Sequence, residues 1–342
     1  MISRLKTSIL SRSKILTRRS LSGEGHILML HRVLHENQRD EYKFNRDLAI
    51  TPKGLERNIK RLKALNYDFI SIGEVEGRLK KPFREKWVVF TLDDGYSDNL
   101  NIALPIFEKH NIPFTIYVSN CFPNNNAIYW WYDLEKYILN NDSVDLNPIN
   151  INLKVSNQSE EEKTKNYKTI RELLRKGDLN LHKSFLVNVV GASLNEYFLK
   201  HSSINLTWEE LASLNKHPLV TIGAHTLNHL SLKNQNDENV KVQIIKGLEE
   251  MEARLGCKIS HFAYPYGSLD DVDLRSVHVL KSKNVKSAVL NHPGGIFKEH
   301  INYPYQLPRM GLSDETSAER LDDFLSGKLH LNFNGVDKVI KL

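Results

Sequence analysis

Two adjacent carboxylates, Asp93 and Asp94, end an apolar run that begins at Val88 and is followed by Gly95. Such a run predicts a buried strand whose carboxyl end presents both acids at the rim of a parallel sheet, where α/β folds carry their chemistry. Side chains alternate along a strand, so the two acids cannot be equivalent, and one can bind a metal ion while the other moves a proton. The alternative is a turn in which one acid caps a helix that starts near Ser97.

A pair of histidines, His225 and His229, directly follows a second predicted strand at 219–223. Histidines four residues apart share one face of a helical turn, so we expect them to hold one cation together; two unrelated histidines are the alternative. Because parallel strands share a rim, the acids and the histidines are expected to meet. Two imidazoles and one carboxylate leave open positions on a divalent ion, which acidifies water and polarises a carbonyl, while the second carboxylate accepts a proton.

The elements that must position these side chains alternate along the chain. Strands are predicted at 27–31, 69–72, 88–92, 114–118, 219–223, 259–264 and 285–290, and helices at 51–65, 99–110 and 239–255. This alternation indicates parallel βα units, and we expect an α/β fold, for which a single α/β barrel with insertions is one solution. The 342 residues, 40% of them hydrophobic, suffice for one large core without a second domain.

The alternation of predicted strands and helices is interrupted between residues 123 and 205, in a stretch rich in polar residues. We interpret it as a partly helical insertion between two strands, anchored at its start by Trp130 and Trp131, with a small apolar face formed by Leu173, Leu174, Leu181, Phe185 and Leu186. The barrel is expected to span 23–320, between a basic leader at 1–22 and a C-terminal tail at 321–342.

The net charge of +6 comes from the leader, because six basic residues precede the first acid, Glu24, and the remaining 41 basic residues balance 41 acidic ones. The balanced body gives no indication of a nucleic-acid groove. Residues 1–19 place apolar side chains near helical spacing between cations. This pattern is compatible with a helix on an anionic membrane surface, with a disordered tail and with an organellar transit peptide.

A secretory signal is not indicated, because the leader has no apolar core of the length that such signals need. The two cysteines, Cys121 and Cys257, do not suggest a disulfide framework in so large a chain. We expect a cytoplasmic protein that touches the inner face of the membrane if the leader binds there.

Taken together, these motifs resemble those of the polysaccharide deacetylases of the nodulation-protein-B type, which are metal-dependent carbohydrate esterases. Residues 91–96, Thr-Leu-Asp-Asp-Gly-Tyr, resemble their first motif, and the resemblance implies that Asp93 is the base and Asp94 a metal ligand. Residues 225–229 resemble the second, with both histidines on the metal. Residues 262–267, which contain Pro265 and Tyr266, resemble the third, which lines the substrate groove and whose Tyr266 N–H would stabilise an oxyanion.

Two features of that family are missing, namely the arginine of the third motif and the late motif with a catalytic histidine. The segment around His31 resembles the opening of the poly-N-acetylglucosamine deacetylases, a permuted branch, and this implies that His31 protonates the departing amine. A structural role for His31, or His292 as the acid, are the alternatives. Arg309 is the candidate to hold Asp93 ionised and oriented; a surface ion pair is the other interpretation.

The resemblance covers about residues 25–312 and implies a distorted barrel of the polysaccharide deacetylase type. The expected reaction removes an N-acetyl group from a sugar of a polysaccharide or glycan precursor and releases acetate. Zinc is the expected cofactor, although cobalt, nickel and manganese also suit the ligand set. The alternatives are a deacetylase or deformylase of a lipid-linked sugar precursor, an O-deacetylase, and a catalytically silent glycan-binding barrel.

Overall fold

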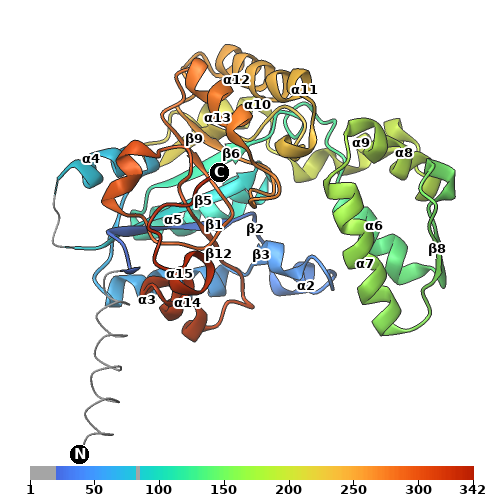
Figure 1. Cartoon of the computed structure of the whole chain (residues 1–342), viewed down its shortest axis with the longest axis horizontal. Coiled ribbons are helices and arrows are strands. Elements are labelled where there is room, and N and C mark those ends of the chain that lie inside the picture. The colour runs from blue at the N-terminus through green and yellow to red at the C-terminus, as the bar shows by residue number, and fades with distance from the viewer. Residues whose placement is uncertain (1–20, 82–84) are drawn as a thin grey trace, which may run out of the picture.

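The computed structural model describes residues 21–81 and 85–342 (Figure 1). The leader predicted at 1–22 therefore lies outside the described residues except for Leu21 and Ser22, which are both buried. Membrane contact through residues 1–19 stays a prediction for the same reason. Within the described ranges, no helix is both long enough and apolar enough to cross a membrane.

A curled sheet of parallel strands forms the centre of the molecule (Figure 1). Its strands lie in the order β11, β10, β9, β6, β5, β1, β12, and β4 pairs with the first part of β5. Their bounds are Gly25–Leu30 for β1, Asp68–Phe69 for β4, Trp87–Asp94 for β5, Phe114–Val118 for β6, Val220–Ala224 for β9, His261–Ala263 for β10, Ser287–Val289 for β11 and Met310–Gly311 for β12. The predicted strand at 69–72 is wrong beyond Phe69, because residues 72–74 form a 3₁₀ turn.

One short segment closes the curled sheet into a distorted barrel. Leu307 forms a parallel bridge with Val289 of β11, and three residues later Met310 pairs with Leu28 of β1. The two edges of the sheet are thus joined through residues 307–311. The predicted α/β barrel is confirmed, and Arg309 lies in the segment that closes it.

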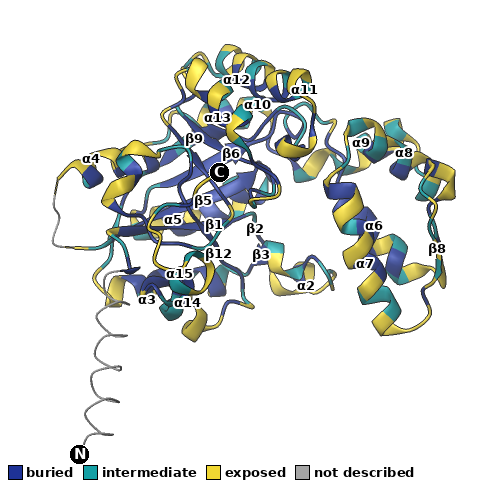
Figure 2. Cartoon of the chain, viewed as in Figure 1, coloured by how far each residue is buried: buried dark blue, intermediate teal, exposed yellow. Residues whose placement is uncertain are grey.

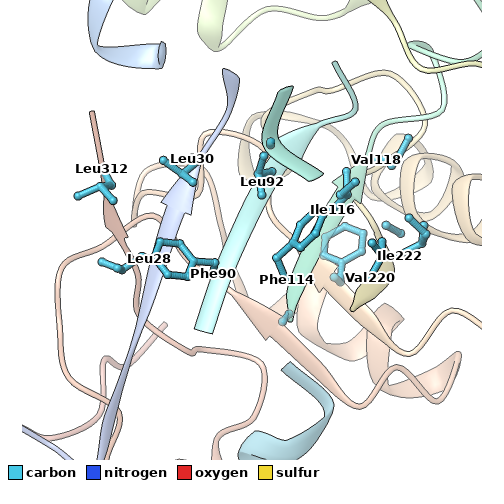
Figure 3. Packing of buried hydrophobic residues seen from close by; sticks show 14 of the residues in the cluster. Leu28, Leu30, Phe90, Leu92, Phe114, Ile116, Val118, Val220, Ile222 and Leu312 are labelled. Atoms are coloured by element: carbon cyan, nitrogen blue, oxygen red, sulfur yellow. The ribbon is translucent and has the colours of Figure 1, made fainter. Parts of the chain in front are cut away.

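The core lies on both faces of the central strands, as expected for parallel strands covered on each side. Figure 3 shows side chains of β1, β5, β6 and β9 in contact, among them Leu28, Phe90, Phe114 and Ile222. Every residue of β1 and β5 is buried, and Figure 2 shows the buried strands inside a shell of helices with exposed outer faces. The apolar run before Asp93 therefore acts as a rigid support for the rim.

Helices connect the strands and cover the sheet. Thr51 caps α3 by accepting a hydrogen bond from the Gly54 N–H at 3.0 Å. The predicted helix at 239–255 is confirmed as a continuous run from Asp237 to Leu255 with a π-helical turn at 242–246. The helix bounds are Glu36–Arg39 for α2, Pro52–Ala64 for α3, Val75–Lys80 for α4, Leu104–His110 for α5, Trp208–Leu214 for α10, Asp237–Lys241 for α11, Gly247–Leu255 for α12 and Leu274–Ser282 for α13.

The C-terminal segment packs on the barrel. It contains α14, Ala318–Leu325, and α15, Lys328–Asn334, and Leu321 and Phe324 belong to the buried core. The ring of Phe324 lies 4.9 Å from that of His26 in β1. The segment expected as a tail, 321–342, thus starts inside a packed helix.

The stretch between β6 and β9 forms a helical lobe beside the barrel (Figure 1). Its elements are α6, Trp130–Asn140; β7, Ser143–Asp145; β8, Lys154–Ser156; α7, Glu160–Arg175; α8, Leu179–Ser184; and α9, Leu194–His201. The lobe has its own apolar cluster, in which Leu174, Phe185 and Leu186 are buried. Leu173, which was expected on the same face, is 40% exposed, because it points away from that cluster.

Candidate active site

Asp93 and Asp94 end strand β5, and the backbone turns sharply directly after them. Asp94 has a φ of +82° and Gly95 a φ of +103°. A positive φ is uncommon for a residue with a side chain and costs conformational energy, which the surrounding structure must offset. The Asp94 carbonyl accepts a hydrogen bond from the Ser119 N–H at 3.1 Å, and this contact helps to hold the turn. The two carboxylates consequently take different partners.

Asp94 faces both histidines. Its Oδ1 lies 3.1 Å from Nε2 of His229 and 3.5 Å from Nε2 of His225. One potential ligand atom from each of the three residues lies within 4.8 Å of the other two. Burial lowers the pKa of His229 despite the nearby carboxylate, so the neutral imidazole is favoured.

These contacts fit a cation. An unprotonated Nε2 and a carboxylate oxygen are both acceptors, and Asp94 Oδ1 is buried without a hydrogen-bond donor among the described residues. The Nδ1–H of His225 donates to the Ala263 carbonyl at 2.8 Å, which directs the opposite ring nitrogen toward Asp94. The donor set, two imidazoles and one carboxylate, suits a divalent transition metal.

The histidines reach this position from a loop. The prediction that they share a helical turn is wrong, because Thr226 and His229 have φ angles of +69° and +55°. The loop is held by distant backbone contacts: the Thr226 carbonyl accepts from Asn120 N–H at 3.2 Å, and the Leu227 N–H donates to the Gln243 carbonyl at 2.9 Å. The spacing of four therefore brings the rings together through tertiary contacts.

Asp93 is bound by Arg309. Two parallel hydrogen bonds of 2.7 Å join the guanidinium to the two carboxylate oxygens, and Arg309 is fully buried. Arg309 also donates to the Leu290 carbonyl at 3.1 Å and to the Thr91 hydroxyl at 3.0 Å. Burial alone would raise the pKa of Asp93, but Arg309, with a smaller contribution from His225, holds it below its ordinary value. The alternative of a surface ion pair for Arg309 is wrong.

A cavity of about 360 Å³ opens above these groups. Its lining includes both acids, both histidines, Arg309, His31 and Tyr266. His31 follows β1, is half-buried, and lies near enough to contribute to lowering the pKa values of both Asp93 and Asp94.

Two further candidates of the sequence lie elsewhere. Pro265 is buried and does not belong to the cavity lining. His292, the alternative acid, contacts Asn334 at 2.8 Å and also does not line the cavity.

Tyr266 lies at the start of the loop after β10. It has a φ of +60°, and its ring lies 4.9 Å from the ring of His229. In the part of the chain that the structure describes, its backbone N–H has no acceptor within hydrogen-bond distance. An amide donor in this position is available to a ligand oxygen.

The helical lobe supplies a wall of the cavity, and the sequence did not point to the part of it that α7 contributes. Two helices of the lobe contribute to this wall: α6 with Trp130 and Trp131, and α7 with Arg171, Glu172 and Arg175. Arg175 pairs with the buried Asp271 on the loop after β10, which ties the lobe to the barrel. The polar stretch that contains α7 carries no motif, so only the packing of the lobe against the barrel identifies these residues.

A second set of contacts anchors the lobe to the segment before α3. The buried Glu135 of α6 accepts hydrogen bonds from the N–H groups of Phe44 and Asn45 at 2.9 and 3.0 Å. The Tyr167 hydroxyl donates to the Asn45 side chain at 2.8 Å. Asn45 itself lines the cavity, so this network holds the lobe at a second point of the cavity wall.

Comparisons with known proteins concern the sequence and the fold. The profile of the polysaccharide deacetylase family matches residues 161–287, a range that includes both histidines and Tyr266. No curated protein matches the sequence.

Several solved structures share the fold. The Streptococcus pyogenes deacetylase PplD in complex with acetate is similar with a TM-score of 0.56 and 17% identity, over 88% of this chain and 97% of that one. The de-N-acetylase from Aggregatibacter actinomycetemcomitans has a TM-score of 0.55 and 15% identity, over 88% and 99% of the two chains. IcaB from Ammonifex degensii has a TM-score of 0.54 and 14% identity, over 88% of this chain and 97% of that one.

Proposed function

We propose that this chain, which belongs to the polysaccharide deacetylase family, is a metal-dependent hydrolase that removes an N-acetyl group from a sugar. The products are acetate and a free amine on the sugar. The observation that carries the proposal is the arrangement at the cavity floor, where the cluster of Asp94, His225 and His229 lies beside the Asp93–Arg309 pair. A glycan-binding barrel without activity would not require this arrangement.

Asp94, His225 and His229 would hold the metal. When bound, a divalent cation supplies Lewis acidity, which acidifies water and polarises the carbonyl of an acyl group. Zinc is the first candidate for this donor set, and cobalt, nickel or manganese are compatible with it.

Asp93 is the proposed base. Arg309 keeps it ionised and fixes the plane of the carboxylate, since both oxygens are held. The pKa of Asp93, which is held below its ordinary value, makes this carboxylate a weak base whose plane and position are fixed. The buried pair thus favours orientation over basicity.

The Tyr266 N–H and His31 complete the proposed chemistry. The amide would stabilise the negative charge that develops on the carbonyl oxygen, and His31 would donate a proton to the departing nitrogen. His31 lies at the exit of β1, on the same cavity as Asp93, and can therefore reach a bound acetamido group. Pro265, which is buried next to Tyr266, acts at most by fixing the Tyr266 backbone.

The proposed substrate is an N-acetylated glycan or a lipid-linked sugar precursor. The first is what the family implies. The second is favoured by the basic residues at 1–19, which suit an anionic membrane surface at the cytoplasmic face. Removal of an O-acetyl or a formyl group would use the same residues.

The test is acetate release from an N-acetylglucosamine oligomer, with the free amines counted in parallel. The account expects equal amounts of acetate and amine, loss of both after chelation, and recovery on adding zinc. A metal-loaded protein that releases acetate from none of the neutral, anionic or lipid-linked substrates would refute the proposed activity.

A further inference from the structure

Two cavity arginines, Arg171 and Arg175, have no part in the proposed reaction, and Arg171 is the more weakly paired of the two. Of the three arginines in the lining, Arg309 is bound to Asp93, and Arg175 is bound to Asp271 and, at 2.6 Å, to Glu172. Arg171 lies 3.8 Å from Glu172, the one acid within ion-pair distance of it in the described part of the chain. Because Glu172 already binds Arg175, the charge of Arg171 is only partly compensated.

The position of Arg171 directs it into the cavity. It lies one helical turn before Arg175 on the same face of α7, and its side chain is 40% exposed. Arg171 and Tyr266 line the same cavity. The Tyr266 ring lies 4.9 Å from the ring of His229, and the three proposed metal ligands line this cavity together with Arg171.

We infer that Arg171 binds an anionic group, a carboxylate or a phosphate, carried by the substrate close to the acetamido group. This inference rests on the proposed deacetylation. A planar guanidinium with free donors matches either group by parallel hydrogen bonds. Asp270, the exposed acid on the loop after β10, disfavours an anion at its own side of the cavity. The anionic group is therefore bound at the α7 wall, and the helical lobe determines substrate specificity.

The experiment compares three substrates of the same reacting sugar. A neutral N-acetylglucosamine tetramer carries no charge, a hyaluronan tetrasaccharide carries carboxylates, and N-acetylglucosamine 1-phosphate carries a phosphate. The parent, Arg171→Gln and the matched control Lys168→Gln are assayed for acetate release. Lys168 is exposed on the same helix and does not line the cavity, so its substitution removes one charge without changing the site.

Arg171→Gln is expected to lower kcat/KM for the better anionic substrate about 10-fold, chiefly through KM, and to leave the neutral tetramer within about twofold. Lys168→Gln should leave all three unchanged. The anion that Arg171 binds is the one carried by the substrate whose kcat/KM falls in Arg171→Gln. If Arg171→Gln lowered kcat/KM equally for all three substrates, or for none of them, the inference would be overturned while the deacetylase activity stands.

A binding measurement covers the case in which no acetate is released. Titration calorimetry of the metal-loaded parent and Arg171→Gln with N-acetylglucosamine 1-phosphate and with the hyaluronan tetrasaccharide reports recognition without turnover. A dissociation constant that rises about 10-fold in the variant for one of them supports the inference even where the proposed reaction fails. The same constant in both proteins contradicts it.

Discussion

Replacement of Arg309 by Met separates the role of Asp93 from that of the metal. The guanidinium makes both 2.7 Å contacts to Asp93 and contacts none of the three proposed metal ligands, so metal content should stay that of the parent. The pair is buried, and removal of one partner from such a pair costs about 3–5 kcal/mol, because it leaves a carboxylate without compensation. Turnover should fall roughly 10²-fold, the loss expected from misplacing a reacting group by about 1 Å.

The pH dependence of the same variant has a defined sign. Arg309 holds the pKa of Asp93 below its ordinary value, and without it burial raises that pKa. The acidic limb of the kcat/KM profile should therefore move to higher pH. The stability that the pair contributes is present above the unfolded-state pKa of about 3.9. The deficit of the variant in urea unfolding should thus be largest near neutral pH and shrink as Asp93 becomes protonated in acid.

Arg175→Met is the matched control. Arg175 also forms a buried ion pair with an aspartate, Asp271, but among the described residues neither partner forms a hydrogen bond or ion pair with Asp93. We expect a comparable loss of stability, with the acidic limb of the profile unchanged. If Arg309→Met kept the turnover and the pH profile of the parent, the orientation role of Arg309 would be refuted.

Three further predictions concern the metal site, the proposed acid and the leader. His225→Ala should lose bound metal and acetate release together, and unchanged metal content in the variant would remove His225 from the site. Zinc added to the parent protein at about 100 times its dissociation constant should stabilise the protein by about 2.7 kcal/mol, measured by unfolding with and without the ion. His31→Ala should retain the metal while turnover falls roughly 10²- to 10⁴-fold, the usual contribution of a general acid; activity within twofold of the parent would leave His31 a structural residue. Deletion of residues 1–19 should abolish binding to vesicles that contain anionic lipid while acetate release from a soluble oligomer persists. Equal vesicle binding by the parent and the deletion variant would refute the proposed membrane contact.

The parts of the site that the sequence predicts lie at strand ends. Residues 88–92 are apolar except for Thr91, which fits a strand, β5, that is buried on both faces, and this signal is local. The pairing of β5 with its neighbours brings Asp94 and His225 to one rim, as alternation of strands and helices implies. These features follow from patterns of a few residues.

Other parts depend on contacts between distant segments. The turn at Thr226 and His229 is fixed by Asn120 and Gln243, so spacing alone suggested a helical turn that does not form. Arg309 reaches Asp93 because residues 307–311 close the barrel, although the chain between β11 and β12 has no regular pattern.

The α7 wall was not predicted for the same kind of reason. Arg171 and Arg175 face the cavity only because the helical lobe packs over the rim, where Asp271 and Asn45 anchor it. In the sequence these arginines lie in an ordinary charged helix.

The most direct test of the account is acetate release by metal-loaded Asp93→Asn. The substitution keeps the size of the side chain, leaves Asp94, His225 and His229 in place, and removes the group proposed to accept the proton. We predict that the variant binds the same amount of metal as the parent and releases acetate roughly 10²- to 10⁴-fold more slowly. Full activity of the metal-loaded variant would contradict the assignment of Asp93 as the base.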